Sequence, residues 1–419
     1  MSDTSETEYN PENIKSAEMV VCIPSYNEVD SISYPTIQAD KGLKKYFGEK
    51  SAVIINCDNN SPDNTRQAFL DTPTDAPKIY ISTAPGVKGK GNNFGNLFRK
   101  VVDLAAQAVV VVDADLKRIT PEWIKHLGEP LYSGFSYVAP LYIRHKYDGT
   151  ITNGIAYPMT RALYGRRVRQ PIGGDFGFSG ELATAYAKGE GWSEAIANFG
   201  IDIWMTTIAI ARRFKVCQTF LGAPKTHRTK DPAKDLGPML TQVVMTFFDL
   251  IIDFEYLWKD TAESQPSSIF GFGLGIEEKP PEVIVDTEAL YQSFISGLDK
   301  YENIWEKIVT KPVLIEARKA KKVPKEKFFY HTDLWAKILF NFVIAYRNNE
   351  IPRKKIIEAL IPFYHSRILS FINRTGHLGT KECEEYCEMI VRIFEKEKYY
   401  LIERWDEDQK KLGHKLFKK

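Results

Sequence analysis

Two carboxylates one residue apart follow a strongly apolar run of the chain. Val109–Val112 is a run of four valines, and Asp113 and Asp115 come directly after it. Four β-branched residues in a row predict a strand that is buried on both faces, as in a parallel sheet covered by helices. Ligands of such sheets bind outside the carboxyl ends of the strands, where these aspartates would lie. The pair can share one Mg²⁺ or Mn²⁺ ion, which could hold phosphate oxygens. The alternative is a loop that is merely acidic.

A loop rich in glycine and lysine precedes this strand. The segment 85–93 contains Lys88 and Lys90 among three glycines. Its spacing is neither that of a P-loop nor that of a dinucleotide-binding fingerprint. Backbone amides beside two lysines nevertheless suit a phosphate group or the edge of a sugar. We therefore expect this loop to take part in ligand binding, and an ordinary surface loop is the alternative.

Two further loops have suitable chemistry. Gln170–Asp175 contains the adjacent glycines Gly173 and Gly174, where the backbone can approach a ligand closely. The turn 222–228 carries His227. A single histidine in a loop is usually a surface residue, but imidazole can also join two carboxylates as a third metal ligand.

The elements that must position these loops follow a regular alternation. Strand, loop and helix recur three times before Asp113, which predicts βαβ units and a parallel, right-handed, doubly wound α/β sheet. We expect further strands and helices up to about residue 213. The expected strands are 19–24, 52–57, 78–82, 109–112 and 135–143.

The pattern changes after Lys234, where apolar residues recur at helical spacing. A Gly/Pro-rich interruption at 271–281 precedes three or four further amphipathic helices, with His331, Trp335 and Phe342 expected mainly in their core. The predicted organisation is a disordered tail at 1–17, an α/β ligand-binding domain at 18–232 and a helical domain at 233–419.

Composition limits the classes of function. The 419 residues are 43% hydrophobic and 26% charged, which is ordinary for a globular protein. The net charge of +2 gives no electrostatic case for nucleic acid as a partner. Five scattered cysteines, of which Cys22 and Cys57 are expected to be buried thiols, favour a reducing compartment. Without a signal peptide or an apolar run of 18 residues, we expect a soluble cytoplasmic protein with no membrane span.

Taken together, the loops resemble those of a known family. In order and spacing, four of them resemble a GT-A glycosyltransferase nucleotide-sugar domain; they are Pro24–Glu28, Asp58–Thr65, Gly89–Gly91 and Asp113–Asp115. The following loops are similar to those of mannosylglycerate synthases and of the related glucosyl-3-phosphoglycerate synthases; they are Gln170–Gly174, Gly200–Asp202, His227–Arg228 and Leu236–Met239. The resemblance covers roughly residues 18 to 250.

The resemblance implies a role for each loop. A divalent cation, Mg²⁺ or Mn²⁺, would be held by Asp113, Asp115 and His227. The catalytic residues would be Asp202, Asp115 and Lys90. Donor-binding residues would be Pro24, Tyr26, Glu28, Asp58, Lys90, Asp113, Ala114, Gly173 and Gly174. Acceptor-binding residues would be Arg144, Asp148, Thr150, Thr152, Ile172 and Gly173.

The implied activity is a metal-dependent, retaining transfer of mannose or glucose from a nucleotide diphosphate, with GDP-mannose or GDP-glucose favoured, to D-glycerate or a similar small hydroxy acid. Phosphoglycerate enzymes carry a phosphate-binding arginine near the position of Thr150, and its absence favours an unphosphorylated acceptor. Asp175 stands where the family usually has glutamate. The alternatives are a glucosyl-3-phosphoglycerate synthase, a more distant nucleotidyltransferase and a non-catalytic nucleotide-sugar-binding protein. The helical tail is expected to form a homo-oligomer.

Overall fold

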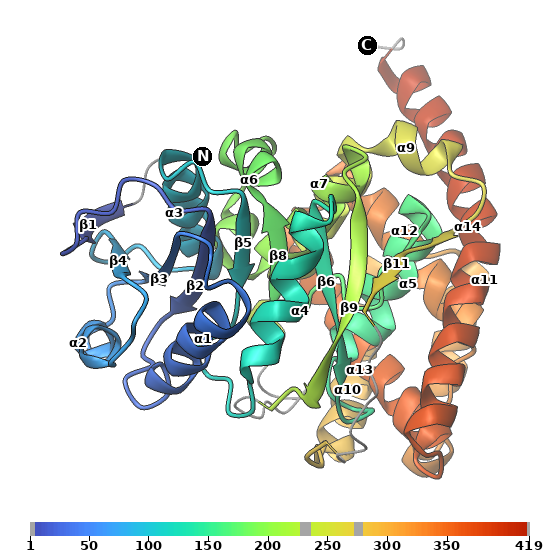
Figure 1. Ribbon diagram of the computed structural model, residues 1–419. Coiled ribbons are helices and arrows are strands. Elements are labelled where there is room, and N and C mark those ends of the chain that lie inside the picture. The colour runs from blue at the N-terminus through green and yellow to red at the C-terminus, as the bar shows by residue number, and fades with distance from the viewer. Residues whose placement is uncertain (1–4, 227–235, 272–279, 417–419) are drawn as a thin grey trace. The chain divides into compact units, whose positions relative to one another are not determined.

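The computed structural model describes residues 5–226, 236–271 and 280–416 (Figure 1). The chain forms two compact units, and both are discontinuous in sequence. The predicted single boundary near residue 232 is therefore wrong, since Lys146–Arg167 belongs with the C-terminal helices. The first unit comprises Met1–His145, Val168–Thr229 and Pro266–Glu282, and the second comprises Lys146–Arg167, Lys230–Gln265 and Val283–Lys419.

A nine-stranded sheet forms the centre of the first unit, in the order β1-β4-β3-β2-β5-β8-β6-β9-β11. All seven residues of β2 are buried, which requires cover on both faces. The predicted α/β architecture is thus confirmed. The strands are β1 (Ser5–Tyr9), β2 (Met19–Ser25), β3 (Ala52–Asp58), β4 (Lys78–Thr83), β5 (Ala108–Val111), β6 (Tyr137–Ile143), β8 (Phe176–Ser179), β9 (Val216–Pro224) and β11 (Ser268–Phe270). Two-residue strands, β7 (Arg166–Arg167) and β10 (Gln265–Pro266), lie outside this sheet.

Two strands run against the predicted parallel direction. β1 pairs antiparallel with β4, from Ser5 opposite Thr83 to Tyr9 opposite Tyr80. The prediction of a disordered tail is therefore wrong for residues 5–9, and residues 1–4 lie outside the described part of the chain. β8 lies antiparallel between β5 and β6. Because β8 is reversed, its first residue lies at the edge where β5 and β6 end.

Helices cover both faces of this sheet (Figure 1). On one face Trp123 of α4 and Leu43 of α1 belong to the same core cluster as Val110 of β5. On the other face Phe98 of α3 contacts the rings of Phe178 and Tyr186. The helical elements of this unit are α1 (Ser33–Tyr46), α2 (Thr65–Asp71), α3 (Lys90–Asp103), α4 (Pro121–Tyr132), α6 (Gly180–Ala187), the π-helical turn η2 (Ile196–Gly200) and α7 (Ile201–Ala211).

The second unit is helical, as predicted. α10 packs along α13, and both α5 and α12 pack against α14. Trp335 and Phe342 are fully buried as expected, whereas His331 is exposed. After the Gly/Pro-rich interruption the described chain has five α-helices, which is more than predicted. The elements are η1 (Thr152–Ala156), α5 (Tyr157–Tyr164), α8 (Gly237–Asp253), α9 (Glu255–Asp260), α10 (Thr287–Ile308), α11 (Lys311–Ala320), the short η3 (Lys325–Lys327), α12 (Thr332–Asn348), α13 (Arg353–Thr375) and α14 (Thr380–Leu416).

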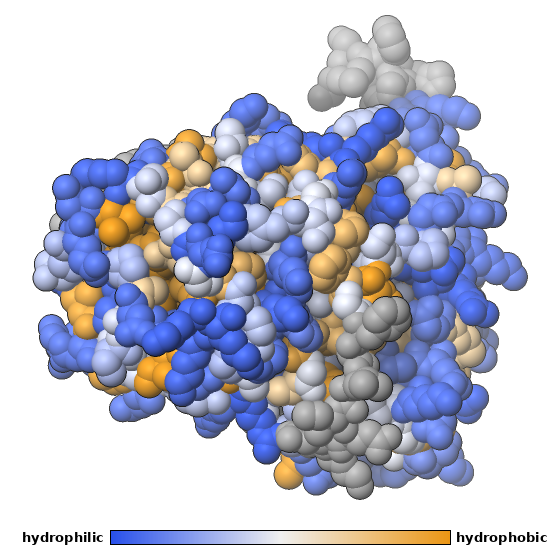
Figure 2. Space-filling view, viewed as in Figure 1, coloured by the Kyte–Doolittle hydropathy of each residue, from blue (hydrophilic) through white to orange (hydrophobic). Residues whose placement is uncertain are grey.

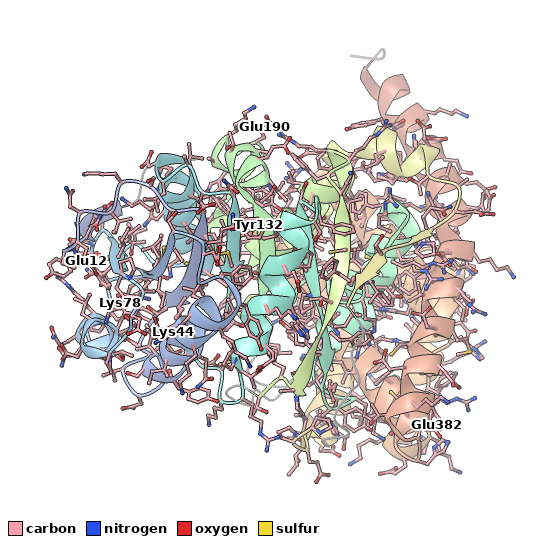
Figure 3. The ribbon with its side chains drawn as sticks, in the orientation of Figure 1. Glu12, Lys44, Lys78, Tyr132, Glu190 and Glu382 are labelled. Carbon is pink, nitrogen blue, oxygen red and sulfur yellow. The ribbon has the colours of Figure 1, made fainter. Side chains whose placement is uncertain are left out.

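Charged side chains lie at the periphery of the units. Lys44, on α1, pairs with Asp75 at 2.5 Å, and both side chains are largely exposed (Figure 3). Hydrophilic residues also dominate the surface where α14 lies (Figure 2). No helix among the described residues has the length and apolarity of a membrane span. The five cysteines are free thiols and all are buried.

Candidate active site

Three strand ends bring charged residues to one edge of the sheet. Asp113 lies two residues after the end of β5. Asp175 directly precedes β8, whose Phe176 is paired with Val111 of β5. Lys225 directly follows β9, which runs parallel to β6. The antiparallel β8 therefore delivers Asp175 to the edge where β5, β6 and β9 end.

Lys225 joins the two aspartates. Its Nζ lies 3.0 Å from Asp113 Oδ2 and 2.7 Å from Asp175 Oδ2, and donates to the carbonyl oxygen of Gly173 at 2.8 Å. Asp175 is fully buried and its Oδ1 accepts the backbone N–H of Asp113 at 2.9 Å. The hydroxyl of Tyr142 lies within hydrogen-bonding distance of Asp175 Oδ2 and of the Gly173 carbonyl oxygen, and its single proton can be donated to either. This closed network fixes the position of the Asp113 carboxylate.

Two helix starts complete the arrangement. Lys90 begins α3, and its Nζ lies 3.2 Å from Asp113 Oδ1 and 3.4 Å from Asp202 Oδ1. Asp202 lies in the first turn of α7, where the helix dipole favours negative charge. We call Lys90, Asp113, Asp175, Asp202 and Lys225 the carboxylate–lysine cluster. Its five side chains are between 0% and 24% exposed.

Burial and neighbouring charges set the protonation of the cluster. Burial alone would lower the lysine pKa values, but the adjacent carboxylates outweigh it and raise the pKa of Lys90 and Lys225. Burial would raise the pKa of Asp113, but the two ammonium groups hold it well below its usual range. Burial raises the pKa of Asp175 and of Asp202. Asp113 is thus an ionised carboxylate between two protonated lysines at neutral pH.

The glycine pair lies against Asp113. Gly174 has φ +88°, and a Cβ at this position would lie 2.4 Å from Asp113 Oδ2 and 3.2 Å from Lys225 Nζ. A side chain here would therefore displace the carboxylate or its lysine partner. The sequence predicted that this backbone approaches a ligand, and the structure places it against a side chain of the cluster. Its contact with a donor or acceptor stays a prediction.

Two asparagines hold the loop that carries Lys90. Asn59 Oδ1 accepts the backbone N–H of Gly89 at 2.8 Å, and its Nδ2 donates to Asn93 Oδ1 at 2.5 Å. Asn93 in turn donates to the carbonyl oxygen of Ser25 at the end of β2. Gly89 adopts φ +123°, which favours glycine. The ends of β2 and β3 therefore position the start of α3.

Two of the predicted donor-binding residues, Asp58 and Glu28, lie in different environments. Asp58 is fully buried, and its oxygens accept hydrogen bonds from the Ser25 hydroxyl, from the backbone N–H and hydroxyl of Ser61 and from the Tyr80 hydroxyl, at 2.6–3.0 Å. Asp58 thus organises the loop after β3, and its contact with a donor stays a prediction. Glu28 is half-buried and accepts the Ser31 hydroxyl at 2.5 Å.

Three other predicted donor contacts differ in exposure. Pro24 and Ala114 are buried, and the Ala114 side chain belongs to the sheet core, so only its backbone could meet a ligand. The Tyr26 ring is half-buried and lies 4.7 Å from Lys88 Nζ of the glycine- and lysine-rich loop.

The predicted acceptor residues divide between the two units. Arg144 follows β6 in the first unit, where its guanidinium donates to Gln170 and lies 5.6 Å from the centroid of the Tyr142 ring. Ile172, also in the first unit, is half-buried. Asp148 and two threonines, Thr150 and Thr152, belong to the second unit and are half-buried or buried. The structure therefore does not show that the predicted acceptor-binding residues form one site.

The structure describes only part of the predicted metal site. Asp115 is half-buried in the loop after Asp113, and His227 lies outside the described residues. Among the residues that the structure describes, no group of three or more His, Cys, Asp or Glu side chains could hold a metal ion. Two carboxylates fit a hard divalent cation in their donor chemistry. Both oxygens of Asp113 contact lysines, so a cation there would replace at least one ammonium group.

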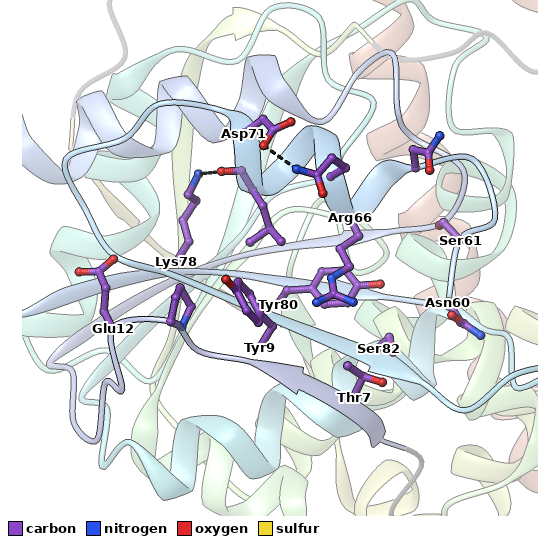
Figure 4. A pocket seen from close by; sticks show the side chains of 14 residues that line it. Thr7, Tyr9, Glu12, Asn60, Ser61, Arg66, Asp71, Lys78, Tyr80 and Ser82 are labelled. Carbon is purple, nitrogen blue, oxygen red and sulfur yellow. Dashed lines mark hydrogen bonds between the residues drawn. The ribbon is translucent and has the colours of Figure 1, made fainter.

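A separate cavity of about 660 Å³ lies in the first unit between β1, β4 and α2 (Figure 4). The guanidinium of Arg66 lies over the rings of Tyr9 and Tyr80, at 5.3 and 5.2 Å from their centroids. None of the described residues that the sequence predicts as site residues lines this cavity. Its volume is in the range of small-molecule sites.

Sequence reasoning missed two members of the site, Lys225 and Tyr142. Lys225 lies two residues before His227, in a turn already predicted to reach the ligand. A lysine so close to a predicted metal ligand was the signal that could have identified it. Tyr142 lies within a predicted strand and gave no comparable signal.

Comparison with known proteins gives distant similarities only. No family model and no curated protein matches the sequence. The glucosyl-3-phosphoglycerate synthase of Mycobacterium tuberculosis, in complex with Mn²⁺, uridine diphosphate and glucosyl-3-phosphoglycerate, is 23% identical, with a TM-score of 0.45, over 56% of this chain and 80% of that chain. Its complex with Mg²⁺ and uridine diphosphate is 22% identical, with a TM-score of 0.44, over 56% and 79%. Such distant similarity does not identify an activity.

Proposed function

We propose that this protein is a metal-dependent glycosyltransferase that moves a hexose from a nucleotide diphosphate sugar to a small hydroxy acid. The observation on which the proposal depends is the carboxylate–lysine cluster at the carboxyl edge of the sheet. There Lys90 lies between Asp113 and Asp202, at the position where α/β sheets bind their ligands. A cluster that contains both carboxylates and ammonium groups suits a cation and a diphosphate.

Each charged residue has a distinct role in this proposal. Lys90, protonated and at a helix start, contacts a diphosphate oxygen of the donor. Asp113 and Asp115, with His227, would hold the divalent cation, which when bound neutralises charge on the leaving nucleotide diphosphate. Asp202 Oδ1 lies 3.4 Å from Lys90 Nζ, and once Lys90 contacts the diphosphate this carboxylate would accept a sugar or acceptor hydroxyl.

The acceptor is proposed to be D-glycerate. A small carboxylate suits the fork of the Arg144 guanidinium, which can bind it through two parallel hydrogen bonds. The lack of arginine in the sequence around Thr150 favours an unphosphorylated acid, and 3-phosphoglycerate is the alternative. We propose retention by attack from the face of the departing diphosphate. Detection of a glycosyl-enzyme on Asp202 by mass spectrometry would contradict this mechanism.

Release of nucleoside diphosphate from the donor, with Mg²⁺ or Mn²⁺ and acceptor present, tests the proposal. Lys90→Met should lower turnover by a factor of about 10² or more, because a charged donor to the leaving group is lost. Lys100→Met, on the same helix but paired with Glu8, is the matched control and should keep normal turnover. Normal turnover of the Lys90 variant would show that the carboxylate–lysine cluster takes no part in the reaction. Donor binding without release of nucleoside diphosphate in the unmodified protein would favour a non-catalytic protein.

A further inference from the structure

The cavity between β1, β4 and α2 contains an arginine without an acidic partner. Arg66 lies on α2, is exposed, and makes no hydrogen bond or ion pair with the residues that the structure describes. Arg318 gives the contrast, since it is also exposed but pairs with Glu302 at 2.7 Å. A guanidinium keeps its charge in proteins, so the N–H groups of Arg66 are open to a ligand.

Two tyrosine rings fix the position of this guanidinium. Its Cζ lies 5.3 Å from the centroid of the Tyr9 ring and 5.2 Å from that of the Tyr80 ring. A guanidinium that lies over aromatic faces is oriented by them and keeps the N–H groups at its edge. Such an edge binds a phosphate or a carboxylate through two parallel hydrogen bonds. The cavity therefore offers a positioned cation to an anionic group.

The other charged residues of the cavity interact with one another. Lys78 Nζ donates to three backbone carbonyl oxygens near the end of α2. Burial lowers the pKa of Lys78, and the charges of Asp71 and Glu12 oppose this shift. Glu12 and Lys78 lie at one end of the cavity and Asn60 at the other (Figure 4). The two carboxylates thus act on Lys78, and Arg66 is left for a ligand.

The rest of the wall suits a molecule with several hydroxyl groups. It presents the amides of Asn60, Asn64 and Gln67 and the hydroxyls of Thr7 and Ser61. The side chains of Asn60 and Asn64 make no hydrogen bond within the described part of the chain. An amide can both donate and accept, as the hydroxyls of a sugar require. The volume of about 660 Å³ also exceeds the needs of a single phosphate ion.

The loop that forms one side of the cavity is held in place by hydrogen bonds. The Ser61 hydroxyl donates to Asp58 at 2.6 Å and accepts the backbone N–H of Asn27 at 2.8 Å. The Tyr80 hydroxyl donates to the same carboxylate at 3.0 Å. This side of the cavity is therefore preformed, as small-molecule sites usually are.

We propose that this cavity binds a sugar that carries one anionic group, either a phosphate or a carboxylate. The anionic group contacts the Arg66 guanidinium, and the sugar hydroxyls contact the amides and hydroxyls of the wall. A nucleotide fits less well, because the rings of Tyr9 and Tyr80 face the guanidinium and not a base. The carboxylate–lysine cluster does not line this cavity. The site goes beyond the proposed transfer reaction and is independent of it.

Isothermal titration calorimetry of the whole chain with glucose 6-phosphate and with glucuronate tests the proposal and distinguishes the two anionic groups. At least one of them should bind, and Arg66→Gln should weaken that binding about 10-fold or more, because a charged hydrogen-bond donor is lost. Arg374→Gln is the matched control and should bind normally, since Arg374 is also exposed and lies over an aromatic ring, that of Phe329, but in the second unit. Lys90→Met should bind normally as well, which separates this site from the cluster.

Four results of the titrations would overturn the proposal. They are equal affinity in Arg66→Gln, no binding of either compound, equal binding of uncharged glucose, and tighter binding of AMP than of both compounds. Crystals of the unmodified protein grown with the compound that binds give a measurement that does not depend on a variant. Its anionic group should contact the Arg66 guanidinium, and density for it only at the carboxylate–lysine cluster would also overturn the proposal.

Discussion

Lys225 lies at the centre of the carboxylate–lysine cluster, and its removal is the sharpest test of how the cluster is held. Its side chain is 6% exposed, and its three N–H donors lie within hydrogen-bonding distance of four groups, namely the carboxylates of Asp113 and Asp175, the Tyr142 hydroxyl and the Gly173 carbonyl. Lys225→Met keeps most of the volume but leaves a fully buried Asp175 without its cation. Breaking a buried pair from one side costs about 3–5 kcal/mol in free energy of unfolding.

Urea unfolding followed by fluorescence measures this cost. Lys225→Met/Asp175→Asn should recover more than half of it, because the uncompensated carboxylate is then removed as well. Lys44→Met, which breaks an exposed pair with Asp75, is the control and should cost less than about 1 kcal/mol. A loss below about 1 kcal/mol for Lys225→Met, or no recovery in the double variant, would refute the argument.

Three further predictions follow from the structure. Gly174→Ala should lower both the free energy of unfolding and turnover, because its Cβ meets Asp113. Gly222→Ala is the control, since Gly222 also has a positive φ but open space around the Cβ, and it should cost only backbone strain. Equal losses of stability and turnover in the two variants would contradict the clash with Asp113. Burial lowers the pKa of Lys398 to about 8, so between pH 8 and about 10.4 the unfolded chain binds more protons and stability should rise with pH. Lys398→Met should flatten that slope in pH-dependent unfolding, and an unchanged slope would contradict the assignment. Arg144→Ala should raise the acceptor KM strongly with little change in donor affinity, as measured by initial-rate kinetics. A raised donor KM with an unchanged acceptor KM would show instead that this arginine binds the donor.

The alternation of strands and helices in the first half could be predicted from the sequence. The strands predicted at 19–24, 52–57 and 78–82 match the bounds of β2, β3 and β4 to within one residue. They were recognisable because strands that are buried on both faces consist of continuous apolar runs. β8 could not be predicted, since Phe-Gly-Phe-Ser is short and contains glycine. Its antiparallel direction depends on pairing with β5, which is distant in sequence.

The site was predictable in its residue types but not in its contacts. Asp113, Lys90 and Asp202 were identified from loop composition and resemblance, and the structure brings them together. The roles of Asp175 and Lys225 depend on a reversed strand and a contact across 50 positions of sequence, which no local pattern encodes. Asp58 was expected to bind the donor, and the structure adds that its buried carboxylate accepts hydrogen bonds from three separate segments, which no local pattern shows.

One measurement tests the proposed activity most directly, namely turnover across a matrix of donors and acceptors. GDP-mannose, GDP-glucose and UDP-glucose are each offered with D-glycerate, with 3-phosphoglycerate and without acceptor, in the presence of Mg²⁺ or Mn²⁺. The proposal predicts metal-dependent turnover with D-glycerate and at least one of these donors, and loss of that turnover in Lys90→Met. Turnover only with 3-phosphoglycerate would contradict the acceptor assignment, and no turnover with any pair would contradict the proposed transfer itself.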